Sequence, residues 1–438
     1  MLVKRNYRSN KKQLQFEDSS KHEDEIPYIS FVTVARNDDH GGNFFGRMLV
    51  FIEMLLVQVE KYGLRAELII VDWNPPPDRI KLYQAIPSSS NYFSDLVKKS
   101  PCKIRIIEVP PELHQRFKHS DKLPLFQMIG KNVGIKRARG QFVVATNIDV
   151  LFTEELIKLI SSKSLKSNYF YRIDRYDVDS IPSGNSMSER LEHCKHNIIR
   201  INRRDGTFIT NSTTGIWLIK RKIFLKHLRK YILSNIHDGI KIVHDEIELL
   251  RYGQKNSDLK LTAKIKLMSK LVANCTTIVL ARLTVLLVAG SVISPISKGM
   301  MLLKKIVSPP YLGLHTNACG DFTLMAREKW NDLHGYPELE MYSFNIDSVM
   351  LQMAYQYGLR EKVFKDPMRM YHMGHSSGWT PEQQENLFKR FRDKGIPVLS
   401  FPEYESLATK MHREKRPLLV NKDDWGLGSE NLPETCLN

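Results

Sequence analysis

The sequence predicts an α/β protein with a mostly parallel sheet flanked by helices, and two observations support this fold class. First, short apolar runs of strand length alternate with longer stretches of helical periodicity through the first 150 residues. Strands that alternate with helices form parallel sheets through right-handed crossovers. Second, polar residues follow the ends of these strands, where ligands bind in open α/β sheets. With 438 residues, the chain can form one large or two ordinary domains.

Composition limits the classes of function. Apolar residues make up 42% and charged residues 26% of the chain, as in ordinary globular proteins, which argues against wholesale disorder. The net charge of +17 suits an acidic partner such as nucleotide phosphates or anionic lipid. We expect no nucleic-acid partner, because no nucleic-acid-binding motif is present. Scattered cysteines and a polar N-terminal segment favour a reducing, cytoplasmic compartment without a secretory signal.

The first half of the chain is expected to begin with a mobile tail over residues 1–25, because these are almost entirely polar. Three apolar runs then predict strands, at 28–35, 67–71 and 103–109. The periodic apolar stretch 44–62 predicts a long helix between the first two strands.

Residues 130–152 carry the strongest pattern in this half. They predict a helix that Gly140 caps at its C-terminus, followed by a buried strand over 142–145. The strand ends in Asn147-Ile148-Asp149. A polar-x-Asp turn at the carboxyl end of a strand can offer oxygen ligands to a divalent cation. The alternative is an ordinary strand that ends in a polar turn.

This stretch resembles the metal-binding core of GT-A glycosyltransferases, especially the inverting family 2 type. In that family, a helix with Asn-x-Gly and Ala-x-Gly patterns, matched here from Asn132 and Ala138, leads into an apolar strand and an Asp-x-Asp motif. Asn147 stands in place of the first Asp, and Asp149 matches the second. The resemblance implies a GT-A-like (nucleotide-diphospho-sugar transferase) sheet, Mn²⁺ or Mg²⁺ bound by Asp149, and donor contacts from Asn147.

The same resemblance implies a nucleotide site in the loops after the first two strands. By position, the residues that would bind the nucleotide are Ala35, Arg36 and Asp72. An aspartate can accept a hydrogen bond from a base or a ribose, Arg36 can meet a phosphate, and the adjacent Trp73 can stack. The alternative for each residue is a solvated loop position.

The later part of the first half, which we assign to residues 26–255, carries weaker signals. Residues 169–174 and 208–220 are predicted as strands. Asp174, Asp177 and Asp179 form a carboxylate cluster that we interpret as a solvated loop.

An inserted hydrophobic helical segment is expected over residues 256–310. Its core, 271–296, is long enough to cross a bilayer, contains one arginine and has lysines on both sides. A single crossing would separate the motifs on its two sides, so docking on an anionic membrane surface is favoured, by a re-entrant or interfacial element or a helical hairpin. A buried core helix remains the alternative. The corresponding location is cytoplasmic, with peripheral or monotopic membrane association.

Residues 311–400 form a second group of motifs. We expect a strand at 322–326, a helix at 327–333 and an apolar helix at 348–357. This arrangement resembles the acceptor half of inverting GT-A enzymes that are similar to β-1,4-galactosyltransferases. The resemblance implies that Asp347 is the catalytic base and that Asp321 contacts the donor sugar or the acceptor. A carboxylate at a helix N-terminus also commonly serves only as a cap, which is the alternative for Asp347.

Two histidines follow this helix, His372 and His375. The resemblance implies that a histidine here completes the metal site, and neutral imidazole suits Mn²⁺ when oxygens fill the other positions. Residues 401–438 are expected to form a polar C-terminal tail, of which Trp425 packs against the body.

Together these features predict a metal-dependent, inverting glycosyltransferase that moves a sugar from a nucleotide-sugar donor to a saccharide or lipid-linked acceptor at a membrane surface. Two alternatives remain open. One is a non-catalytic, membrane-associated carbohydrate-binding scaffold, which Asn147 keeps possible. The other is a sugar nucleotidyltransferase, for which Gly41-Gly42 is the only phosphate-loop feature.

Overall fold

A computed structural model of the protein describes residues 26–210, 217–219, 313–375 and 384–438. The chain divides into two compact units, one made of Met1–Asn202 with Leu314–Asn438 and the other of Arg203–Gly313. These limits differ from the expected limits of the insert, 256–310. In the second unit, β9 (Gly206–Thr210) and β10 (Trp217–Ile219) pair antiparallel, so the stretch expected as one strand, 208–220, contributes to two.

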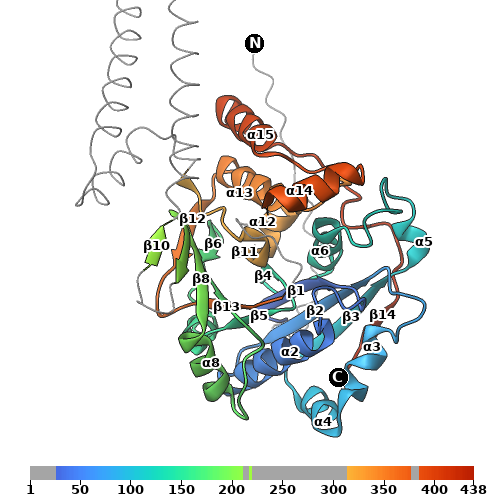
Figure 1. Ribbon diagram of the computed structural model, residues 1–438, viewed down its shortest axis with the longest axis vertical. Helices are drawn as coiled ribbons and strands as arrows, with labels where there is room; N and C mark the ends of the chain where they lie inside the picture. The colour runs from blue at the N-terminus through green and yellow to red at the C-terminus, as the bar shows by residue number, and fades with distance from the viewer. Residues whose placement is uncertain (1–25, 211–216, 220–312, 376–383) are drawn as a thin grey trace, which may run out of the picture. The chain divides into compact units, whose positions relative to one another are not determined.

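The first unit is built on an eight-stranded sheet with helices on both faces, which confirms the expected α/β class (Figure 1). In spatial order the strands are β12 (Arg360–Phe364), β6 (Tyr169–Ile173), β11 (Phe322–Ala326), β4 (Phe142–Thr146), β1 (Ile29–Ala35), β2 (Ala66–Trp73), β3 (Lys103–Val109) and β14 (Glu434–Cys436). The four central strands, from β4 to β3, are parallel as predicted. β11 and β14 join antiparallel to their neighbours, so the sheet is mixed.

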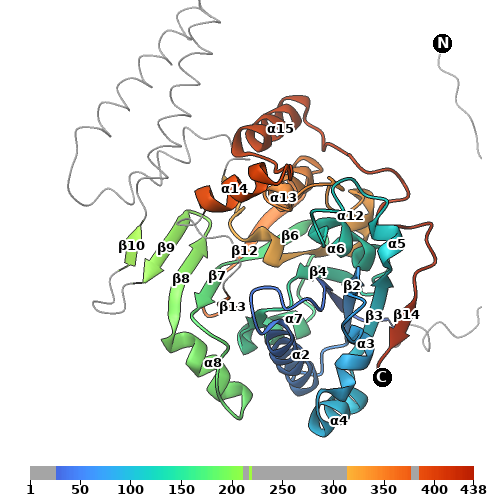
Figure 2. The same ribbon diagram turned by 45° about the vertical axis from the view of Figure 1, so that its right-hand side comes forward.

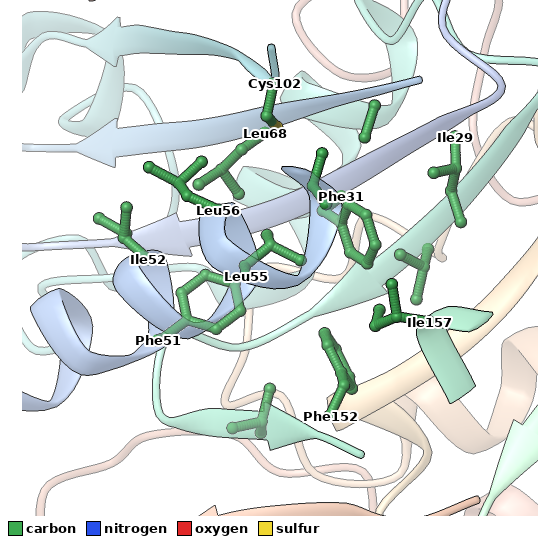
Figure 3. Packing of buried hydrophobic residues seen from close by; sticks show 14 of the residues in the cluster. Ile29, Phe31, Phe51, Ile52, Leu55, Leu56, Leu68, Cys102, Phe152 and Ile157 are labelled. Atoms are coloured by element: carbon green, nitrogen blue, oxygen red, sulfur yellow. The ribbon is translucent and has the colours of Figure 1, made fainter. Parts of the chain in front are cut away.

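Alternation along β1 explains why both faces of the sheet are covered. Ile29 and Phe31 point into one hydrophobic core and Val32 and Val34 into the other, because successive side chains of a strand face opposite ways. The first core contains α2 (Phe44–Lys61), α4 (Asn91–Lys99) and α7 (Glu154–Ser161), and Figure 3 shows α2 packing on β1 and β2. The second contains α6 (Gln127–Lys136), α12 (Arg327–Asp332), α13 (Ile346–Gln356) and α15 (Phe401–Glu414).

The glycines of α6 let this helix lie close to the sheet. A Cβ on Gly130 would come within 2.5 Å of Val34, and one on Gly134 within 2.5 Å of Val32. The helix ends at Lys136, so the expected cap at Gly140 is wrong. Gly140 instead approaches the backbone of β1, where its amide donates to Ser30 Oγ at 2.9 Å.

A smaller sheet of the first unit lies beside the carboxyl end of β4. Its strands are β5 (Val150–Phe152), β13 (Met370–Met373), β7 (Arg175–Val178) and β8 (Ile198–Arg203), with α8 (Met187–His196) between β7 and β8. β13 pairs with β5 on one side and β7 on the other, so His372 lies between Val150 and Asp177. Asp177 is buried in a strand, and its expected place in a solvated loop is therefore wrong.

The C-terminal region is part of the fold. After α14 (Gln384–Asp393) comes α15, and residues 434–436 then form β14 at the edge of the main sheet. Trp425 is buried, as expected. Short helices α3 (Leu82–Ala85), η1 (Pro87–Ser89), α5 (Pro111–His114) and η3 (Cys319–Asp321) complete the described elements. None of the described helices has the length and apolar character needed to cross a membrane. The segments 1–25 and 271–296 lie outside the described residues.

Candidate functional site

A cavity of about 650 Å³ opens at the carboxyl ends of β1 and β4 in the first unit. Its walls come from the loop after β1, the turn between β4 and β5, η3, the end of β13 and the starts of α13 and α15. Eight of the residues predicted to form a site line it: Ala35, Arg36, Asn147, Asp149, Asp321, Asp347, His372 and His375. The sheet therefore brings together side chains that are more than 300 positions apart in the sequence.

Asp149, His372 and His375 form a cluster that could hold a metal ion. One potential ligand atom from each residue lies within 4.8 Å of the other two. Asp149 Oδ2 is 3.7 Å from His372 Nε2 and 3.3 Å from His375 Nε2. Asp149 Oδ1 is buried and has no hydrogen-bond partner among the described residues. A buried carboxylate with an unused oxygen, beside two imidazoles, fits a divalent cation such as Mn²⁺.

The charges in this cluster favour an ionised carboxylate. Burial alone would raise the pKa of Asp149, but His372, His375 and Arg47 outweigh it and hold that pKa well below its usual range. Burial and Arg175 lower the pKa of His372, yet the carboxylates of Asp149 and Asp177 prevail and raise it. The cluster therefore contains a negative carboxylate that stabilises positive charge next to it.

Asp177 orients His372 and was missed by sequence reasoning. Its Oδ1 lies 3.4 Å from His372 Nδ1, and Arg175 Nε approaches the same oxygen to 2.8 Å. With Nδ1 facing Asp177, Nε2 of His372 faces Asp149, which is the arrangement that protein metal sites use to fix a histidine ligand. The strand that carries Asp177 has only four residues, Arg-Tyr-Asp-Val, so its alternation is too short to be recognised from the sequence.

Asn147 forms hydrogen bonds with three residues, none of which belongs to the cluster of Asp149, His372 and His375. Its Oδ1 accepts from Lys131 Nζ at 2.7 Å and Gln127 Nε2 at 3.1 Å, and its Nδ2 donates to Asp321 Oδ1 at 2.5 Å. Lys131 is fully buried, and burial lowers its pKa to about 8. An asparagine suits this place better than an aspartate, because an aspartate would face Asp321 without a donor. Lys131 was not predicted, since it lies on the buried face of α6.

Asp321 is held by partners on both oxygens. Asn147 donates to Oδ1, and Arg175 Nη1 forms an ion pair with Oδ2. Arg175 also pairs with Asp177, so it connects Asp321 to the carboxylate that lies beside His372. Asp321 therefore holds Asn147 and Arg175 in place.

Asp347 lies where α13 begins and faces the cavity. Its Oδ2 accepts from the Gly320 amide at 2.6 Å, and its Oδ1 accepts from the Ser348 amide at 2.8 Å. A Cβ on residue 320 would come within 3.0 Å of Oδ2, so glycine permits this approach. The N-cap position itself belongs to Asn345, whose side chain makes no capping bond. Burial raises the pKa of Asp347, which suits a carboxylate that takes up a proton.

The residues predicted to bind a nucleotide separate into two groups. Ala35 and Arg36 line the cavity, whereas Asp72 and Trp73 do not. Trp73 is fully buried, and its Nε1 donates to His114 Nδ1 at 2.9 Å, so a stacking role for its ring is wrong for this conformation. Asp72 is 1% exposed, accepts from the Leu82 amide at 3.1 Å and has a pKa raised to about 6 by burial. It stabilises the loop after β2 instead of reaching the cavity.

Arg47 adds a buried cation that the sequence did not indicate. It projects from α2, a mostly apolar helix, and donates to the backbone carbonyls of Gly42 and, at 2.6 Å, His40. Its Nε has no hydrogen-bond partner among the described residues, and Asp149 stabilises its charge. Arg47 therefore offers a donor on the β1 side of the cavity that suits a phosphate, whereas the charge of Arg36 is paired with Asp38.

Comparison with known proteins adds no further assignment. No protein-family model matches this chain, and no curated protein is significantly similar to it in sequence.

Proposed function

We propose that the protein is a metal-dependent glycosyltransferase with a GT-A-like fold, which transfers a sugar from a nucleotide-sugar donor to a saccharide or lipid-linked acceptor. One observation carries the proposal. Within a single cavity beyond parallel strands, a candidate cation site made of Asp149, His372 and His375 accompanies Asp347, a carboxylate whose pKa is raised. Group transfer from a diphosphate needs both features, a positive site for the leaving group and a base for the acceptor.

In the proposed inverting reaction, Asp347 takes the proton of an acceptor hydroxyl as that oxygen attacks the anomeric carbon. The bond between this carbon and the diphosphate oxygen breaks, and the nucleoside diphosphate leaves with its electron pair. The amides of Gly320 and Ser348 hold both oxygens of Asp347, so the carboxylate needs no reorientation during the reaction. Asp321 and Asn147 are assigned to positioning, because Asp321 forms an ion pair with Arg175 and an asparagine cannot act as a base.

The leaving diphosphate would lie near the β1 side of the cavity. A divalent cation, held by Asp149, His372 and His375, supplies charge neutralisation at the diphosphate when it is bound. Arg36 and Arg47 line the same cavity and can donate to phosphate oxygens. Asp177 keeps His372 in the orientation that a cation requires.

The test is a thermal-shift screen of UDP-, GDP- and dTDP-sugars with Mn²⁺ or with a chelator, followed by donor hydrolysis. We expect at least one nucleotide-sugar to raise the melting temperature with Mn²⁺ only, and to be hydrolysed slowly. Asp149→Ala should abolish both effects, whereas Asp179→Ala, at an exposed position, should not. Cation-dependent binding without hydrolysis or transfer would favour the scaffold alternative. A pyrophosphate product would favour the nucleotidyltransferase.

We also propose that the enzyme acts at a membrane surface. This rests on the sequence of the apolar stretch 271–296 with its flanking lysines. The protein should bind anionic liposomes less well as salt rises, because salt screens the attraction between lysines and headgroups. If a protein lacking residues 271–296 sedimented with liposomes as well as the intact chain, this location would be wrong.

A further inference from the structure

One part of the cavity wall is aromatic. Tyr342 and Phe344 precede α13, Phe391 lies on α14, and Phe401 and Tyr404 lie on α15. Four of the rings pack in two pairs, with centroids 4.1 Å apart for Tyr342–Phe391 and 5.3 Å for Phe344–Phe401. All five residues are half-buried, so they retain surface that faces the cavity.

The same wall carries three cations. Lys122, Arg390 and Lys394 line the cavity and are exposed. A Cβ on Gly395 would lie 3.3 Å from Lys122 Nζ, so this ammonium group is next to the end of α14. No described residue forms an ion pair with any of the three. We call these three cations and the five aromatic residues the aromatic–basic lobe.

The acidic residues of the cavity have other partners. Asp38 pairs with Arg36, Asp149 with the two histidines, and Asp321 with Arg175. Asp347 is held by backbone amides. Among the described residues, no acidic residue that lines the cavity neutralises the lobe, so its positive charge is available to a ligand.

The lobe adjoins Asp347. α13, which begins beside Asp347, packs against α15, and Figures 1 and 2 show these helices next to one another. Gln352 of α13 donates to the Tyr404 hydroxyl at 2.7 Å, which fixes this ring at the cavity wall. A molecule seated on the lobe can therefore extend a hydroxyl toward Asp347.

We propose that the aromatic–basic lobe binds the acceptor and that the acceptor is an acidic saccharide, one that carries a carboxylate or a phosphate. This deepens the proposed function and rests on it. The apolar C–H face of a sugar ring packs on aromatic faces, whose negative quadrupole attracts the polarised hydrogens. Arg390, Lys394 and Lys122 supply the charge that an anionic substituent needs.

The test compares three matched saccharides, glucose, glucuronate and glucose 6-phosphate, by saturation-transfer NMR titration at constant ionic strength. We expect one or both acidic sugars to bind at least about tenfold more tightly than glucose, as two exposed charge contacts can supply. The pair of acidic sugars separates carboxylate from phosphate recognition. Inorganic phosphate and acetate serve as competitors that carry the anion without the sugar.

A matched pair of double variants on α14 tests the residues. Arg390→Gln with Lys394→Gln should reduce binding of the preferred acidic sugar about tenfold and leave glucose unchanged. Lys389→Gln with Arg392→Gln removes the same charge from exposed positions outside the cavity lining and should change neither. Phe344→Leu should weaken all three saccharides but not inorganic phosphate, because it removes an aromatic face and no charge.

Several results would overturn the proposal: equal binding of glucose and the acidic sugars, equal losses in the two double variants, or competition by inorganic phosphate alone. A weaker affinity for the nucleotide-sugar in the Arg390/Lys394 variant would assign the lobe to the donor instead. If acidic sugars bind as expected but no nucleotide-sugar does, the lobe stands and the transferase proposal fails. If donor binding and hydrolysis occur but the acidic sugars bind no better than glucose, the transferase proposal stands and the proposal for the lobe fails.

Discussion

Two polar clusters in the first unit, each with buried charged side chains, differ in how completely their hydrogen bonds are formed. The first, which we call the strand cluster, consists of Glu67, Arg105 and Glu434. Glu67 accepts from Ser30 Oγ at 2.6 Å and from Arg105 Nη1 at 2.8 Å. Arg105 binds Glu434 through two parallel hydrogen bonds, of 2.7 and 3.0 Å. This cluster joins β1, β2, β3 and β14, and its ionised groups are satisfied within the protein.

The second, the site cluster, consists of Asp149, Asp177, His372, His375 and Arg47. It is similarly buried, yet Asp149 Oδ1 and Arg47 Nε lack hydrogen-bond partners among the described residues. A buried polar atom without a partner costs about 1–3 kcal/mol of stability. A protein that retains such atoms in a cavity fits one that uses them to bind a ligand. From this contrast we propose a structural role for the first cluster and a binding role for the second.

The largest expected effect separates turnover from stability at Asp347. General-base catalysis contributes about 10²–10⁴-fold, so Asp347→Asn should lower turnover by that factor. Donor affinity should change little, because Asp347 is assigned to the acceptor side. Asn keeps the shape but can accept from only one of the two amides, so the melting temperature should fall modestly. If Asp347 serves only to hold the backbone amides at the start of α13, Asp347→Asn should transfer sugar normally, and Asp347→Ala should lose more stability than Asp347→Asn.

Arg105→Ala should have the opposite effect, a loss of folding stability without a loss of donor binding. It leaves Glu67 buried without its charge partner, and breaking a buried pair costs about 3–5 kcal/mol of unfolding free energy. Urea denaturation measures the loss, and Arg139→Ala, an exposed residue 3.8 Å from Glu434, is the control. Donor binding by the folded fraction should be unchanged. A stable Arg105→Ala protein would remove the distinction between the two clusters.

Asp177→Asn is expected to affect metal affinity by a smaller factor. Losing an orienting carboxylate beside a histidine ligand typically weakens metal binding 10–100-fold. Titration of Mn²⁺ followed by electron paramagnetic resonance would measure this without any enzymatic assay. Metal affinity equal to that of the wild type would mean that Asp177 serves the fold alone.

The pH dependence should report the environment of Asp347. Because burial raises its pKa, the acid limb of the rate profile should lie above the usual aspartate value of about 3.9. Turnover falls as pH decreases through this pKa, since a protonated carboxyl cannot act as a base. The effect on folding stability has the opposite sign. The raised pKa stabilises the folded state fully at a pH below the pKa of Asp347 in the unfolded chain, and this stabilisation is lost as pH rises through its pKa in the folded protein. An acid limb at or below 3.9 would contradict this assignment.

The sequence predicted the parts of the fold that depend on local pattern. The strands β1, β2, β3, β4 and β11 and the helices α2 and α13 follow apolar runs of recognisable period. Asp149, His372 and His375 were expected from the resemblance to hold a metal, and the structure places them in one cluster. Asp149 and the histidines come together through the pairing of β5 with β13, which no local pattern specifies.

The residues that sequence reasoning missed owe their roles to tertiary contacts. Lys131 and Arg47 lie on α6 and α2. The apolar period of a helix can indicate which positions are buried, but it does not reveal which partners a charged side chain at such a position has. Asp177 depends on a four-residue strand, and Glu434 on the pairing of β14 with β3 across more than 300 positions. The opposite error occurred at Trp73, which was expected to stack on a nucleotide but is buried. An aromatic residue at the end of a strand can point into the core as readily as into a site.

Direct binding of Mn²⁺ tests the central claim that the site cluster is a binding site. Titrated into metal-free protein and followed by electron paramagnetic resonance, Mn²⁺ should occupy one site per chain. Asp149→Ala should eliminate that site, whereas Asp179→Ala and Glu67→Gln, in the fraction that folds, should retain it. If the wild-type protein binds no Mn²⁺, or if Asp149→Ala binds it equally well, the unpartnered oxygen of Asp149 does not mark a metal site and the account is wrong.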